Sequence, residues 1–239
     1  MINFIVSNRV CHKRYVQEIS EKTGSEIIYI EGKNQLTLET LEYYRPRYIF
    51  FPHWSYLIPA EIYEQYECVV FHMTDLPYGR GGSPLQNLVS RGLYQTKISA
   101  LRCVRDLDAG DIYMKRDFSL YGAAEEIYIR AGEIIKEMII EMIQKRPAPQ
   151  AQSGEIVSFK RRRPEESNIS MLQDLLQVFD YIRMLDADGY PKAFLETEYL
   201  RLEFTRASLK DGYIKADVEI RTKECKNEKS SAGSSGASG

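Results

Sequence analysis

Residues 68–84, CVVFHMTDLPYGRGGSP, contain the pattern from which the fold follows. The apolar run at 68–73 is typical of a buried strand, and a glycine-rich loop leads from it into a helix near PLQNLVSRG. Similar apolar runs, each followed by a segment with helical periodicity, come before it at residues 2–7, 26–32 and 48–54. After it, two more strands and a long amphipathic helix are predicted at residues 96–104, 111–118 and 123–145. Strands that alternate with helices at this spacing predict an α/β fold with a doubly wound, Rossmann-like, mostly parallel sheet.

The composition changes after residue 145. Residues 146–154 are rich in Pro, Gln and Ser and have no periodicity, which indicates a linker. Beyond it, a helix-like segment and several strand-like runs predict a small C-terminal α+β or barrel-like domain. A low-complexity tail rich in Gly and Ser ends the chain and is predicted to be disordered. The expected organisation is an N-terminal domain over 1–145, the linker, a small domain over 155–222 and the tail over 223–239.

The chain of 239 residues has a formal net charge of −2, with 44% hydrophobic and 28% charged residues, as in ordinary globular proteins. Proteins that grip nucleic acid through its phosphates usually carry a basic domain or stripe, so no nucleic-acid partner is expected. Cysteines are scattered, with no C-x-x-C pair, which fits a reduced cytoplasm and argues against a zinc site. No run approaches about 20 apolar residues, so no membrane span is expected. These patterns predict a cytoplasmic protein without membrane contact.

Three polar side chains follow neighbouring strands of the predicted sheet. His53 closes the third strand, His72 closes the fourth, and Asp108 lies in the loop after the fifth. Ligands of doubly wound sheets bind at the carboxyl ends of the strands, so these residues are expected at one site. An imidazole there can transfer a proton or stabilise an oxyanion, and a carboxylate beside it can support its charge. The alternative is that each histidine is an ordinary, hydrogen-bonded residue at a strand end.

Two segments resemble the signature of the formyltransferase family, which includes methionyl-tRNA, glycinamide-ribonucleotide and sugar N-formyltransferases. They are FHMTDLPYGRGGSP (71–84) and DLDAGDIY (106–113). The residues that fall on the family pattern are His72, Leu76-Pro77, Arg80-Gly81, Pro84, and Asp108 to Asp111. FKRRRPEES (159–167) and YIRMLDADGYPKAF (181–194) resemble the second domain of sugar N-formyltransferases. The resemblance covers about residues 2–222.

This resemblance implies a metal-independent enzyme that transfers a formyl group from N10-formyltetrahydrofolate, its co-substrate, to an amine. His72 would stabilise the oxyanion of the tetrahedral intermediate and Asp108 would support the charge of the imidazole. One position departs from the family: Val70 stands where an asparagine amide helps to hold the oxyanion. Adjacent parallel strands lie about 5 Å apart, so His53 is the candidate replacement, and simple packing beside Trp54 is its alternative.

Binding residues are also implied by the resemblance. The folate is expected between two loops, in contact with Trp54, Leu57, Ile58, Arg105, Asp106 and Leu107. Ordinary core packing is the alternative for the leucine and isoleucine of the first loop. Five residues are expected to contact the acceptor: Arg9 and Arg80, which could meet a pyrophosphate, then Gly81, Met73 and Thr74. A solvated surface position is the alternative for each arginine.

The acceptor is expected to be a nucleotide-linked amino sugar, in particular a UDP-4-amino-4,6-dideoxy sugar of a pseudaminic-acid-type pathway for cell-surface polysaccharide. An aminoacyl group on a carrier protein, as in the formylation domain of linear gramicidin synthetase, is an alternative. Methionyl-tRNA is disfavoured because residues 151–222 contain eleven Lys and Arg against thirteen Asp and Glu. A non-catalytic folate- or nucleotide-binding module is the alternative of another class. Relatives are often homodimers, and the same is expected here.

Overall fold

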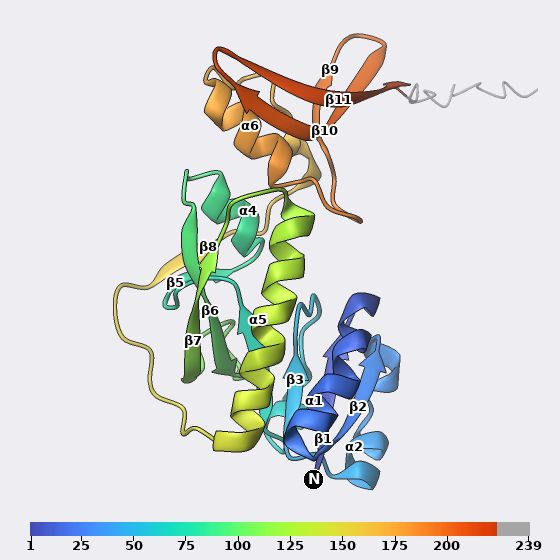
Figure 1. Cartoon of the computed structure of the whole chain (residues 1–239), viewed down its shortest axis with the longest axis vertical. Coiled ribbons are helices and arrows are strands. Elements are labelled where there is room, and N and C mark those ends of the chain that lie inside the picture. The colour runs from blue at the N-terminus through green and yellow to red at the C-terminus, as the bar shows by residue number, and fades with distance from the viewer. Residues whose placement is uncertain (224–239) are drawn as a thin grey trace, which may run out of the picture.

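The fold is organised around a six-stranded mixed sheet (Figure 1), and the computed structural model describes residues 1–223, apart from the side chains of residues 10 and 11. Its strand order is β2-β1-β3-β4-β6-β7. The first four of these strands run parallel, whereas β6 and β7 form an antiparallel hairpin beside β4. The strands are β1 (Ile2–Ser7), β2 (Glu26–Glu31), β3 (Ile49–Phe51), β4 (Cys68–His72), β6 (Gln95–Arg102) and β7 (Ile112–Ser119). The predicted α/β class with a mostly parallel sheet is confirmed.

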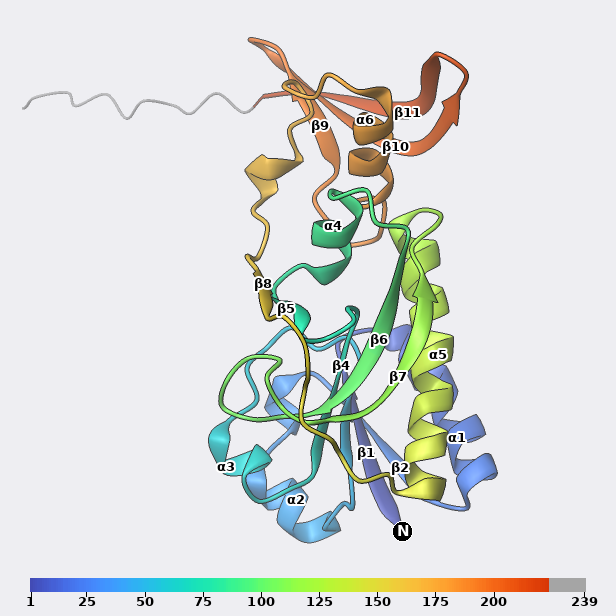
Figure 2. The ribbon, with the colours of Figure 1, turned by 90° about the vertical axis from the view of Figure 1, so that its left-hand side faces the viewer.

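Helices cover both faces of this sheet (Figure 2), with α1 and α5 on one face and α2 and α3 on the other. The alternation of side chains along β1 explains how both faces become apolar. Phe4 and Val6 pack toward α2 and α3, Ile5 packs toward α1 and α5, and all three are buried. The helices are α1 (Tyr15–Thr23), α2 (Leu38–Tyr44), α3 (Ala60–Tyr63), α4 (Pro84–Val89) and α5 (Ala124–Lys145), with 3₁₀ turns η1 (Val10–Arg14) and η2 (Lys33–Gln35).

The third strand is shorter than the segment 48–54 predicted for it. β3 ends at Phe51 because Pro52 has no N–H to donate to a neighbouring strand. The next residue, His53, has a φ of 51°, in the left-handed region, which turns the chain out of the sheet. The prediction that His53 closes a strand is therefore wrong, and this side chain stands on a turn beyond β3.

The glycine-rich segment, predicted to be a loop, contains a strand. β5 (Tyr78–Gly81) pairs in parallel with β8 (Val157–Phe159), which comes from beyond the predicted linker. Only glycine fits at the last position of β5, because a Cβ on Gly81 would lie 2.3 Å from the Phe159 carbonyl oxygen. The linker itself is held to the main sheet by a bridge between Gln150 and Ile112. The division of the chain into domains at 146–154 stays a prediction.

The C-terminal part is a three-stranded antiparallel sheet of order β11-β10-β9 packed with α6. Its elements are η3 (Pro164–Ser167), α6 (Leu175–Arg183), β9 (Ala193–Glu196), β10 (Leu200–Lys210) and β11 (Tyr213–Thr222). The buried Arg183 joins it to the segment between β7 and α5, because this guanidinium donates to the carbonyl oxygens of Leu120 and Gly122, and it also pairs with Asp180 on α6 itself. The small C-terminal α+β unit is confirmed, as an open sheet. The predicted tail from residue 224 lies outside the described residues.

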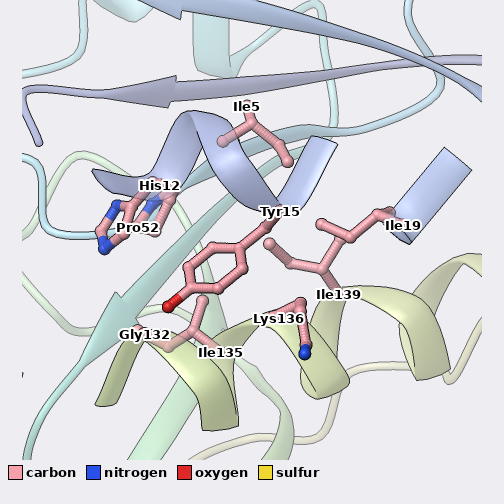
Figure 3. Close-up of a pocket in the computed structure, with 9 residues that line it drawn as sticks. All are labelled: Ile5, His12, Tyr15, Ile19, Pro52, Gly132, Ile135, Lys136 and Ile139. Atoms are coloured by element: carbon pink, nitrogen blue, oxygen red, sulfur yellow. The ribbon is translucent and has the colours of Figure 1, made fainter. Parts of the chain in front are cut away.

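A small cavity of about 10 Å³ lies between β1, α1 and α5 (Figure 3). That volume holds one water molecule at most, so the cavity cannot take a substrate. His12 lines it, and its Nδ1 lies 2.8 Å from Ser7 Oγ. Burial, with Arg9 and Arg14 nearby, lowers the pKa of His12 to about 4. His12 is therefore a neutral, structural residue of the core at neutral pH. Among residues 1–223, no helix has the length and apolar character needed to cross a bilayer.

Candidate active site

A cavity of about 570 Å³ opens beyond the carboxyl ends of β3 and β4. This is the size of an ordinary small-molecule site. Its wall combines residues from the turn after β3, the end of β4, the glycine-rich segment and the loop between β6 and β7. The sequence-predicted site residues that line it are His53, Trp54, Leu57, Ile58, His72, Met73, Gly81, Arg105, Leu107 and Asp108. The topology thus brings most of the predicted site together.

His72 and Asp108 face one another in the wall of this cavity. His72 Nε2 lies 2.7 Å from the carbonyl oxygen of Gly79. A carbonyl oxygen can only accept, so Nε2 carries a hydrogen and donates it. The other ring nitrogen, Nδ1, lies 3.5 Å from Asp108 Oδ2, and each of the two side chains is only 8% exposed. The Asp108 carboxyl group therefore faces Nδ1 where both side chains are shielded from water.

The loop that carries Asp108 is shaped by backbone constraints. Asp108 has a φ of 53°, a conformation that aspartate tolerates better than most residues. Its carboxylate accepts a hydrogen bond of 2.9 Å from the N–H of Gly81. Two residues on, a Cβ at Gly110 would lie 1.9 Å from the Arg102 carbonyl oxygen, so the chain there needs glycine. The Asp-x-Gly spacing therefore has a steric reason as well as a chemical one.

His53 lines the same cavity from the turn after β3. Its ring packs edge-on against Tyr128, with 4.8 Å between the ring centroids. Burial lowers the pKa of His53 to about 3, helped by the charge of Arg9 and by His12. The imidazole is therefore neutral at physiological pH and presents one N–H donor and one acceptor.

Val70 contributes to an apolar wall of the cavity. It lies two residues before His72 on β4, so both side chains point to the same face of the strand. Val70 packs in one cluster with Trp54, Ile58 and Cys103. The Nε1 atom of Trp54 is buried without a hydrogen-bond partner. Such an orphaned donor beside an apolar wall is suited to a flat heteroaromatic ligand that brings an acceptor.

Four predicted binding residues do not line the cavity. Thr74 is fully buried beneath the glycine-rich segment, 3.5 Å from the Gly79 carbonyl oxygen, and cannot reach a substrate. Arg9 is occupied by an ion pair of 3.5 Å with Glu125 and stacks on a tyrosine of α5. The remaining two, Arg80 and Asp106, do not face the cavity either, and Arg80 binds a side chain of the linker. The lining of the cavity gives no support to the predicted ligand contacts of these four residues, which stay predictions.

Several cavity residues escaped the sequence analysis. Gln86, Tyr128, Arg161 and Tyr190 all line the cavity and come from α4, α5 and the C-terminal half of the chain. Helical periodicity identifies Tyr128 only as a buried residue of α5. Arg161 belongs to the basic run FKRRRP, and the positive charge of this run is the one signal in the sequence that could have indicated a ligand contact. Among the described residues, no cluster of three His, Cys, Asp or Glu could hold a metal ion.

Known proteins resemble this chain over most of its length. Residues 164–221 match the family model described as the methionyl-tRNA formyltransferase C-terminal domain. The solved methionyl-tRNA formyltransferase from Clostridium thermocellum is 50% identical, with a TM-score of 0.90, over 93% of this chain and 100% of that chain. The curated methionyl-tRNA formyltransferase of Rickettsia felis is 28% identical over 167 residues, 63% of this chain and 54% of the relative. The chain therefore spans about half the length of the curated relatives it matches.

Two solved structures of lower identity share the fold. HypX from Aquifex aeolicus in complex with tetrahydrofolic acid is 21% identical, with a TM-score of 0.71, over 86% of this chain and 37% of that chain. A sugar N-formyltransferase from Shewanella sp FDAARGOS_354 is 13% identical, with a TM-score of 0.66, over 83% of this chain and 93% of that chain. Contrary to expectation, the sugar enzymes are thus more distant than a methionyl-tRNA formyltransferase. With half of its residues identical to that enzyme over nearly its whole length, this chain belongs to the formyltransferase family.

Proposed function

We propose that this chain transfers a formyl group from N10-formyltetrahydrofolate to the amine of methionyl-tRNA. The observation that carries the proposal is the shielded pair of His72 and Asp108 in the wall of a substrate-sized cavity. The acceptor is suggested by the 50% identical relative, whose name is methionyl-tRNA formyltransferase. If tRNA carries the acceptor amine, the expectation that the protein has no nucleic-acid partner no longer holds. The net charge of −2 averages over the whole surface and says little about the mouth of one cavity.

The chemistry follows from the groups in the wall. The neutral acceptor nitrogen forms a bond to the formyl carbon, the bond from that carbon to N10 breaks, and N10 takes a proton while the acceptor nitrogen loses one. Negative charge develops on the formyl oxygen during attack. His72 Nδ1, once protonated, would donate to that oxygen, and Asp108 would stabilise the resulting imidazolium and receive the proton that the acceptor loses.

The folate would bind along the apolar wall, where it supplies an activated formyl group. Trp54 offers a buried, unpartnered Nε1 donor, and the exposed side chain of Leu57 lines the same cavity. Arg105 and Leu107 line the cavity from the loop between β6 and β7. HypX, which shares the fold, was solved with tetrahydrofolic acid. We propose these residues as the folate-binding part of the cavity.

A nucleotide-linked amino sugar, such as a UDP-4-amino-4,6-dideoxy sugar, is the second candidate acceptor. It is suggested by the Shewanella enzyme that shares the fold, whose title is sugar N-formyltransferase. An aminoacyl group on a carrier protein is a further alternative acceptor, and its amine would be formylated by the same chemistry. A homodimer remains an expectation drawn from relatives alone.

An acceptor comparison tests the proposal. The protein is incubated with N10-formyltetrahydrofolate and, in parallel, methionyl-tRNA, a UDP-4-amino-4,6-dideoxy sugar or an aminoacyl carrier protein. Mass spectrometry then detects the addition of one formyl group. We expect formylation of methionyl-tRNA at the highest rate. Formylation of the sugar alone would reject the tRNA acceptor but keep the transfer chemistry, and folate binding without transfer to any amine would favour a non-catalytic module.

His53 is the proposed donor in place of the amide missing at Val70. Its ring is neutral, lines the cavity and has an N–H available, so His53→Ala should lower kcat by about 100-fold, at the lower end of the range for loss of an oxyanion donor. His53→Asn, which keeps an N–H donor, should retain more activity than alanine. Initial rates at saturating substrates decide the point. Unchanged turnover in His53→Ala would limit this residue to packing against Tyr128.

A further inference from the structure

Gln152 joins the two halves of the candidate site through its side-chain amide. Its Nε2 donates to the carbonyl oxygens of Asp108 and Gly110, at 2.8 Å each. Its Oε1 accepts from Arg80, at 3.1 Å from Nε and 2.8 Å from Nη2. Both hydrogens and both lone pairs of the amide are therefore used, which is the full capacity of a glutamine side chain.

The atoms that Gln152 holds are those that set the position of the carboxylate. Asp108 has a left-handed φ of 53°, which few non-glycine residues adopt without support. Its carbonyl oxygen is bound by Gln152 from one side, while its carboxylate is bound by the N–H of Gly81 from the other. Arg80 precedes Gly81 on β5 and is bound by the same glutamine. One side chain thus connects the aspartate loop with the strand that orients its carboxylate.

The backbone beside Gln152 is itself anchored. Gln150 and Ile112 exchange two backbone hydrogen bonds, of 2.8 and 2.9 Å. These bonds fix the linker backbone at Gln150 to the start of β7. Two residues later along the extended chain, the Gln152 side chain reaches the Asp108 loop. The side chain of Gln150 is exposed, and its backbone makes the bridge. Both glutamines therefore lie in the linker, but only the side chain of Gln152 binds the Asp108 loop.

We propose that Gln152 is a positioning residue, which sets the separation of Asp108 from His72 through the Asp108 carbonyl and through Arg80. The proposal rests on the formyl transfer proposed above. It also gives Arg80 a role other than substrate contact, since this guanidinium donates two hydrogen bonds to Gln152. Misplacement of a reacting group by 1 Å can cost about 100-fold in rate, so a loosened aspartate loop should be visible in turnover.

The test compares Gln152→Ala, Gln152→Glu and the matched control Gln150→Ala. Gln152→Ala should lower kcat by about 10- to 100-fold, with a much smaller rise in the KM of the folate. Gln152→Glu keeps the acceptor for Arg80 but presents a carboxylate to two carbonyl oxygens, so it should lose as much kcat as alanine. Gln150→Ala should behave as the wild type. Full kcat in Gln152→Glu would show that the hydrogen bond from Gln152 to the Asp108 carbonyl oxygen does not matter for turnover, and it would overturn the proposal.

A second readout separates this proposal from the proposed function. Hydrogen exchange, followed by mass spectrometry on peptides covering residues 105–111, should become faster in Gln152→Ala and remain unchanged in Gln150→Ala. Equal protection of this loop in wild type and Gln152→Ala would overturn the positioning role, whether or not the wild type transfers formyl groups. Absence of transfer by the wild type, with faster exchange in Gln152→Ala, would reject the proposed function alone.

Discussion

Replacement of His72 by alanine is expected to lower the rate of formyl transfer by about 10²–10³-fold. The imidazole lies in the cavity wall with Nε2 fixed by the Gly79 carbonyl and Nδ1 facing Asp108, so one specific donor is lost. Initial rates at saturating donor and acceptor measure the effect.

The folded state of His72→Ala must be measured alongside its rate. The Gly79 carbonyl oxygen loses its 2.7 Å donor, which costs about 1–3 kcal/mol if the group stays buried and unpaired. Thermal unfolding should therefore show a lower but still cooperative transition. Truncation of His12, the buried histidine of the small cavity, provides the comparison, because it should cost stability with little direct effect on kcat. A folded His72→Ala protein with wild-type turnover would exclude His72 from the chemistry.

The second large effect is expected for Asp108→Asn, with kcat lowered about 10²-fold or more. Asparagine has the same shape, tolerates the left-handed φ of 53°, and its carbonyl can still accept from the Gly81 N–H. What is lost is the negative charge 3.5 Å from His72 Nδ1. The substitution therefore changes the electrostatics of the pair and leaves the loop in place.

Asp106→Asn is the matched control for this substitution. Asp106 lies on the same loop, two residues earlier, but its side chain is exposed and does not line the cavity. Kinetics at saturating substrates should show a large loss for Asp108→Asn and near wild-type kcat for Asp106→Asn. Similar losses in the two variants would point to the overall charge of the loop, and the specific pairing of Asp108 with His72 would have to be abandoned.

The sheet could be predicted because periodicity reports burial directly. Phe4, Ile5 and Val6 form a continuous apolar run, and both faces of β1 are indeed covered by helices. The early end of β3 could not be read from hydrophobicity, since Pro52 and His53 act through a missing donor and a backbone angle. The pairing of β5 with β8 was also missed, because it joins residues about 80 positions apart and rests on glycine sterics.

The position of His72 was predictable because this residue ends β4, where ligands of such sheets bind. The approach of Asp108 does not follow from strand ends, because β6 runs antiparallel to β4 and ends beside Val69; Asp108 meets His72 because the loop between β6 and β7 folds back toward the end of β4. Which way a loop side chain points does not follow from a motif: Arg80 turns to Gln152, and Thr74 is buried. Tyr128 and Tyr190 reach the cavity from a helix and from the C-terminal part, and only the packing of these parts reveals them. Net charge could not decide the acceptor, because it does not describe the local groups at a cavity, such as Arg161.

The central claim is that this chain moves a formyl group from the folate to an acceptor amine through the His72 site. The most direct measurement uses N10-formyltetrahydrofolate with a ¹³C-labelled formyl group and methionyl-tRNA, and follows tetrahydrofolate release and label in the aminoacyl product together. We expect the two to appear in equal amounts, only with acceptor present, and both to be lost in His72→Ala. Tetrahydrofolate released without label in any acceptor, or equal transfer by wild type and His72→Ala, would contradict the account.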